Sequence, residues 1–220
     1  MTWMGSAALQ PHSMDEVDST VVASDLAAVM LPRLIVIGGA QGATDAARRI
    51  LKALPSTLPA AVIVVMHGRP GEQGDGSDGL AGERFPLPTR IAKAGHRIAA
   101  GEVLLTPTGC HVQVVEGGII EIDGPKLVRT SRSTVDMLFE SAAALFQRGV
   151  ISVVLSGRGD DGTDGSRSVK AGGGITVVQS PSDAQFVGMP MAAILGDHPD
   201  HCPLIHQIAP LLIELVGTPP

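Results

Sequence analysis

The residues of this chain that could do chemistry follow three apolar runs directly. They are the turn containing Ala40 and Gln41 after run 34–39, His67 after run 60–66, and Asp160 and Asp161 after run 150–156. Each run has the composition of a strand covered on both faces. In an open α/β sheet, ligands bind at the edge formed by the carboxyl ends of the strands. We therefore expect these positions to converge on one site.

A histidine and an aspartate in this arrangement indicate hydrolysis. In a Ser-His-Asp triad, a base deprotonates the nucleophile and an acid orients the base. His67 and Asp161 can fill the last two roles. The turn at 38–43 lies where a nucleophile would stand, with helix N-terminal amides available to hold an oxyanion. Its apex carries Ala40, which has no reactive group.

Two other uses of these loops fit poorly. A dinucleotide fingerprint needs G-x-G-x-x-G and an acidic residue at the end of the second strand. Here the turn reads Gly-Gly-Ala-Gln-Gly-Ala, and His67 occupies the acidic position. A calcium loop counted from Asp160 places Gly162 at position three and Ala171 at position twelve, where oxygen ligands are required. We expect no cofactor.

The segment 197–206 is the remaining candidate for metal binding. It contains His198, His201, Cys202 and His206. Their spacing matches no common zinc pattern, so we interpret the segment as a solvated loop that leads into the last helix. No metal is expected.

The elements that would position the site alternate between strands and helices. Helical periodicity follows the first strand, covers 133–149 and 165–172, and returns at about 203–216. Segment 102–123 has the turn residues of a hairpin, and 68–88 is expected to be a long mobile loop. The pattern predicts an α/β fold with a doubly wound, mostly parallel, Rossmann-like sheet and a small antiparallel hairpin.

Composition restricts the partners. The net charge is −6, and the 220 residues include one Trp, four Phe and no Tyr, which disfavours nucleic acid. No apolar stretch reaches the length of about 20 residues that spans a bilayer, and no secretory signal is evident, so a cytoplasmic protein without membrane insertion is expected. We interpret 1–32 as a partly disordered tail, with one short helix near 22–30, and 33–220 as one domain.

Six segments occur in an order that is informative as a set. They are IGGAQGA (37–43), HGRP (67–70), TPTGCH (106–111), RSTVDMLFESAA (132–143), LSGRGDDG (155–162) and FVGMPMAA (186–193), the last read as a loop. Together they resemble the catalytic domain of the chemotaxis protein-glutamate methylesterase family, CheB. The resemblance covers about residues 33–216.

The resemblance implies a role for each matching position. The family's base falls on His67, its orienting aspartate on Asp161, and its serine nucleophile on Ala40. The implied substrate and oxyanion pocket comprises Gly39, Gln41, Gly42, Arg158 and Met189. Gln41 and Arg158 stand where the family has a threonine and a methionine. The nucleophile turn thus resembles one that has lost its hydroxyl.

A slip of the register by one position would leave a neighbour as nucleophile. No Ser or Cys occurs between Met30 and Ser56, and Thr44 is expected beyond the apex, in the first turn of the helix. We therefore predict a catalytically disabled member of the family that binds or regulates. An active esterase or amidase, in which His67 activates water, is the alternative.

The family's reaction is hydrolysis of glutamate methyl esters on chemoreceptors, together with glutamine deamidation. The resemblance therefore implies that the partner is a chemoreceptor-like protein or its methylated helix. The family also carries a receiver domain. The roughly 30 residues before Arg33 are too few to form one. Phosphorylation control is accordingly expected from a separate receiver-domain protein.

Overall fold

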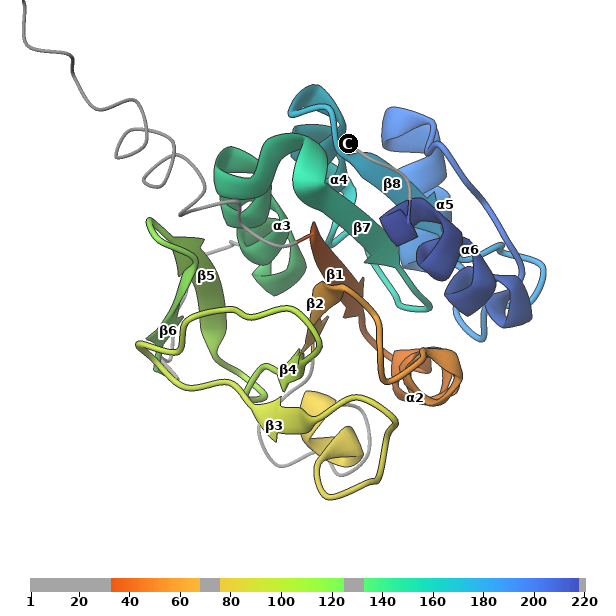
Figure 1. Ribbon diagram of the computed structural model, residues 1–220. Helices are drawn as coiled ribbons and strands as arrows, with labels where there is room; N and C mark the ends of the chain where they lie inside the picture. The colour runs from red at the N-terminus through yellow and green to blue at the C-terminus, as the bar shows by residue number, and fades with distance from the viewer. Residues whose placement is uncertain (1–32, 68–75, 125–132, 218–220) are drawn as a thin grey trace, which may run out of the picture. The chain divides into compact units, whose positions relative to one another are not determined.

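A computed structural model describes residues 33–67, 76–124 and 133–217 (Figure 1). Its centre is a six-stranded sheet in the order β3-β4-β2-β1-β7-β8, and each neighbouring pair is parallel. The strands are β1 (Arg33–Gly39), β2 (Ala60–Met66), β3 (Thr89–Ile91), β4 (Val103–Leu105), β7 (Val150–Val154) and β8 (Ile175–Val178). The predicted doubly wound sheet is confirmed.

Helices cover both faces of the sheet because its central strands are apolar on both sides. In β1, Ile35 and Ile37 pack with α2 (Ala43–Ala53) and α6 (Ile205–Gly217). The alternate residues Leu34 and Val36 pack on the other face, under α3 (Thr134–Phe146). Burial on both faces explains why the strands are continuous apolar runs in the sequence.

The second face carries three further elements. They are α4 (Thr163–Ala171), α5 (Gly188–Asp197) and the antiparallel hairpin of β5 (His111–Val115) and β6 (Ile119–Asp123). A 3-10 turn, η2 (Ser77–Leu80), precedes β3, and a second one, η3 (Gln147–Gly149), follows α3. No helix in the described part of the chain is long and apolar enough to cross a bilayer.

Four details of the sequence prediction need correction. The segment 186–193 is not a loop, because α5 begins at Gly188. Within 102–123, the first strand, β4, joins the central sheet and only β5 and β6 form the hairpin. Strand β3 was not predicted, and α6 begins at Ile205, two residues later than expected. The predicted helix near 22–30 and residues 68–75 of the predicted loop lie outside the described residues.

The position of β1 determines where a site can form. It lies between β2 and β7, and the chain runs outward through β2 on one side before it returns to β7 on the other. Such a switch point leaves a crevice at the carboxyl ends of the strands. The segments that follow β1, β2 and β7 all begin at this edge.

Candidate active site

The turn after β1 is tightly fixed by backbone contacts. Ala40 donates its amide to Ser156 O at 3.0 Å, and its carbonyl accepts the amide of Ala43 at 3.0 Å. Gly42 has φ +76°, and a Cβ there would lie 2.6 Å from Gln185 Oε1. Only glycine meets both demands at low cost. The turn therefore has little freedom to present a different residue at its apex.

The methyl group of Ala40 points into a packed environment. Ala40 is 6% exposed and belongs to the same apolar cluster as Met189, which is fully buried in α5. A Cβ on Gly157 would lie 3.0 Å from Ala40 Cβ and would overlap Met189 Sδ. Met189, predicted as a pocket residue, is therefore a buried packing residue near Ala40.

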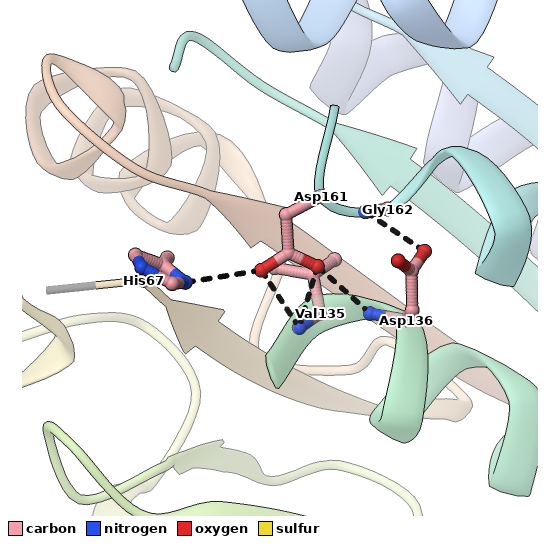
Figure 2. A network of polar contacts seen from close by, with 5 residues as sticks. All are labelled: His67, Val135, Asp136, Asp161 and Gly162. Carbon is pink, nitrogen blue, oxygen red and sulfur yellow. Dashed lines mark hydrogen bonds and ion pairs between the residues drawn. The ribbon is translucent and has the colours of Figure 1, made fainter. Parts of the chain in front are cut away.

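His67 lies directly after β2, beside the β1 turn. Its amide donates to Gly39 O at 2.8 Å. Its Nδ1 lies 3.2 Å from Asp161 Oδ2, a hydrogen bond between residues 94 positions apart (Figure 2). The structure thus brings His67 and Asp161 together at one edge of the sheet, as the strand ends predict. The His67 side chain is 58% exposed, so solvent reaches it.

The contact with Asp161 changes the protonation of His67. The hydrogen bond to the carboxylate raises the pKa of the imidazole above its usual 6.5, partial burial opposes this, and the charge attraction adds to it. Because Nδ1 faces Asp161, Nε2 is left for a second proton-transfer partner. This is the ring orientation that a general base in a triad requires.

Asp161 is held at the N-terminus of α3. Its Oδ1 accepts the amides of Val135 and Asp136 at 3.0 and 3.1 Å, and Oδ2 lies 3.3 Å from the Val135 amide (Figure 2). The first amides of a helix have no partner within the helix, and they attract negative charge. The N-terminus of α3 therefore fixes the orientation of the carboxylate that contacts His67.

Asp136 completes a reciprocal arrangement that sequence reasoning missed. Its Oδ1 accepts the amides of Gly162 and Gly165 at 2.9 and 2.8 Å, which cap the N-terminus of α4. Burial raises the pKa of Asp136 to about 6, although the Gly165 and Gly162 amides oppose this and the charge of Asp161 adds to it. An acidic residue in the first turn of a predicted helix was the available signal.

Ser156 is the second residue that sequence reasoning missed. Its hydroxyl donates to Gln41 O at 2.9 Å and accepts the amide of Phe186 at 2.9 Å. Its own amide donates to Gln179 Oε1 at 3.0 Å. Ser156 is 1% exposed. It therefore ties the β1 turn to the segment before α5 and is not free to act as a nucleophile.

The other hydroxyl near the turn is also unsuited to attack. Thr44 is the second residue of α2, beyond the apex as predicted, and is 6% exposed. Its Oγ1 has no hydrogen-bond partner among the described residues, so no contact with His67 activates it.

Arg158 and Gln41 lie on the exposed side of the site. The Arg158 guanidinium stacks on the ring of Phe186, with 4.7 Å between Cζ and the ring centroid. Both Arg158 and Gln41 are exposed. Of the predicted pocket residues, Gly39 and Gly42 form the turn and Met189 packs nearby. The exposed side chains of Gln41 and Arg158 are therefore the ones that can face a ligand.

The His and Cys residues of segment 197–206 do not converge. His198 has φ +47° at the end of α5, and the backbone of His201 bridges Val177 of β8. Burial and the nearby Asp183 raise the pKa of the Cys202 thiol. In the portions of the chain that are described, no three His, Cys, Asp or Glu side chains are grouped to hold a metal ion.

The sequence matches the model of one protein family, CheB methylesterase, over residues 35–212. The chain belongs to that family. Among curated relatives, a protein-glutamate methylesterase/protein-glutamine glutaminase of Symbiobacterium thermophilum is 34% identical over 186 residues, which are 84% of this chain and 51% of the relative. A protein of the same name from Methanosarcina acetivorans, numbered 2, is 31% identical over 84% of this chain and 53% of the relative.

A solved structure agrees with this assignment. The crystal structure of the Thermotoga maritima CheB methylesterase catalytic domain superposes with a TM-score of 0.74 at 26% identity. The match covers 84% of this chain and 100% of that domain. The chain spans about half the length of the curated CheB relatives named above.

Proposed function

We propose that this chain is a cytoplasmic CheB-family protein that binds chemoreceptors without hydrolysing their glutamate methyl esters. The observation that supports this most directly is the contrast within the site. The His67–Asp161 hydrogen bond is present at 3.2 Å, whereas the residue that follows β1 is Ala40. A base and its orienting acid do not suffice for acyl transfer through a covalent intermediate, which needs a nucleophile.

The neighbouring hydroxyls add to this argument. Ser156 is buried and already engaged by Gln41 and Phe186, and Thr44 is buried in the first turn of α2. Neither is hydrogen-bonded to His67 in the structure. Loss of a triad serine removes about 10⁶-fold of kcat in a serine protease, so turnover by this chain should fall below detection.

One observation favours a second function. The His67 side chain is 58% exposed, so water can approach it, and the hydrogen bond to Asp161 raises the pKa of its imidazole. An esterase or amidase in which His67 activates water directly is therefore the alternative. The two functions differ only in whether the ester is hydrolysed, because both use the same partner.

Methanol release from a methylated chemoreceptor distinguishes them. We expect no methanol release above the uncatalysed rate from the wild-type chain. We also expect this chain to co-sediment with receptor-containing membranes. Release that disappears in His67→Ala would establish the water mechanism. His206→Ala is the matched control, because His206 is an exposed histidine on α6, which packs against the opposite face of the sheet.

A further inference from the structure

Among the described residues, most of the large exposed apolar side chains lie on α5 or directly before it. In the described part of the chain, four large apolar residues are prominently exposed: Val187, Met191, Leu195 and Ile213, at 47%, 39%, 73% and 39%. The first three are spaced by four residues along α5 and its N-terminal flank. Residues four apart share one face of a helix. They form an apolar ridge about 12 Å long, from the rise per residue.

This ridge begins at the active site. Gly188 approaches the loop after β7 so closely that a Cβ would lie 3.0 Å from both Gly157 O and Gly159 N, and 3.1 Å from Arg158 Cα. Met189, in the next position, contributes to the cluster that contains Ala40. The N-terminal end of the ridge therefore lies beside the loop that carries Arg158.

Arg158 supplies a cation at the same end of the ridge. Its guanidinium lies on the ring of Phe186, the residue before Val187, and it makes no ion pair within the described residues. Stacking restrains the side chain while leaving the edge of the guanidinium open. That edge has the paired N–H groups that a carboxylate accepts in bidentate fashion.

We propose that the ridge of Val187, Met191 and Leu195 docks an amphipathic helix, and that Arg158 selects a free glutamate carboxylate over its methyl ester on that helix. The proposal rests on the proposed function in one respect, since the helix is taken to be a chemoreceptor's. The chemistry of the surface sets the rest: the apolar stripe needs an apolar partner face, and the unpaired cation favours a negative charge beside it. A methyl ester offers Arg158 a weaker, neutral acceptor.

The consequence for a protein without a nucleophile is specific. It would bind the demethylated receptor helix, the product of the reaction its relatives are named for, and report the methylation state without changing it. Selection by charge needs no catalytic step, so it is compatible with Ala40 in the turn after β1.

The test uses the full chain and one helical peptide from the methylation region of a chemoreceptor, prepared with glutamate, glutamate methyl ester or glutamine at one site. Fluorescence anisotropy measures each affinity. We expect the glutamate peptide to bind several-fold to about tenfold more tightly than the other two, the range for one partly exposed charge-assisted contact. Arg158→Met should abolish that preference, because it should weaken the glutamate peptide more than the other two.

Two further variants test the ridge. Met191→Asp should weaken all three peptides together, whereas Ile213→Asp, equally exposed on α6, should weaken none. Equal binding of the three peptides by the wild type, or a preference that survives Arg158→Met, overturns the selection by charge. Wild-type affinity in Met191→Asp overturns the ridge. Failure of every peptide and of receptor membranes to bind overturns the proposed function as well, whereas binding without discrimination overturns this inference alone.

Discussion

At the scale of single residues, the turn after β1 carries Ala40, whose side chain has no hydroxyl for His67 to activate. We expect Ala40→Ser alone to restore little ester hydrolysis, although His67 and Asp161 remain in contact. Gln41 and Arg158 are both exposed beside the turn, and a misplacement of about 1 Å can cost about 100-fold in rate. The triple change Ala40→Ser, Gln41→Thr and Arg158→Met should hydrolyse faster than the single change.

The rates should be compared at equal concentrations of folded protein on a small ester and on methylated receptor. Adding His67→Ala to the triple variant provides the control, because it should return hydrolysis to background. If Ala40→Ser alone reached the rate of an active family member, the surrounding pocket would be intact and our argument from Gln41 and Arg158 would be wrong.

His67 also makes a pH-dependent contribution to stability. Its pKa in the folded protein is raised above 6.5, chiefly by the hydrogen bond to Asp161. A raised folded pKa means that the pair stabilises the fold fully below about pH 6.5 and that this contribution is lost as pH rises through the folded value. The destabilisation caused by His67→Ala should therefore be larger at pH 5.5 than at pH 9.

Urea unfolding at the two pH values measures this difference. Because the imidazole is more than half exposed, we expect a difference of no more than about 1 kcal/mol. His206→Ala, whose exposed side chain is on α6, corrects for the general effect of losing a histidine. Equal destabilisation by His67→Ala at both pH values would contradict the assigned direction of the shift.

At the scale of elements, α3 and α4 exchange carboxylates at their N-termini. Asp161 accepts amides of α3, while Asp136, in the first turn of α3, accepts amides at the start of α4. We predict that Asp136 is a positioning residue for His67. Asp136→Ala should lower the His67 pKa toward 6.5, because the loop that carries Asp161 loses its anchor, whereas Asp136→Asn, which keeps the acceptor oxygen, should leave it close to wild type.

Titration of the His67 ring resonances by NMR gives the readout. Asp164→Ala is the matched control, because Asp164 is an exposed carboxylate in the first turn of α4 that pairs with Arg167. Should Asp136→Ala fail to fold, Asp136→Ser offers a shorter acceptor and should lower the pKa in part. An equal decrease in Asp136→Asn and Asp136→Ala would indicate a purely electrostatic effect and refute the positioning role.

The sequence was most informative where an element has a strong local pattern. His67 and Asp161 could be predicted because apolar runs end near them and parallel strands bring those ends together. The contact of Ser156 with Gln41 joins residues 115 positions apart, and neither residue marks it. Strand β3 has three residues and no apolar run. Gly188 and Pro190 suggest a loop, yet Pro190 is tolerated in the first turn of α5 because no intrahelical bond is lost there.

At the scale of the whole molecule, β1 is the element on which the fold depends most. It pairs with β2 and β7, and its residues 34–37 are completely buried. Because the sequence predicts that residues 1–32 are a tail, removing them should leave the thermal midpoint within a few degrees of the full chain. Removing 1–40, which deletes all of β1, should abolish cooperative unfolding.

Circular dichroism melts of the three chains test this, with receptor co-sedimentation as a second measurement on each folded chain. A large fall in the midpoint after removal of 1–32 would show that the sequence-based division into a tail and a domain is wrong. The same result would place part of the stabilising core before Leu34.

The reciprocal capping of α3 and α4 has a consequence for how such proteins evolve. Asp161 satisfies amides of α3 whether or not His67 ever takes a proton, so selection for folding alone retains it after turnover has ceased. A lineage that lost its nucleophile would keep the aspartate, because the aspartate still caps α3. The presence of that aspartate in a relative is thus weak grounds for inferring an active enzyme, and the residue that follows β1 is the more informative one.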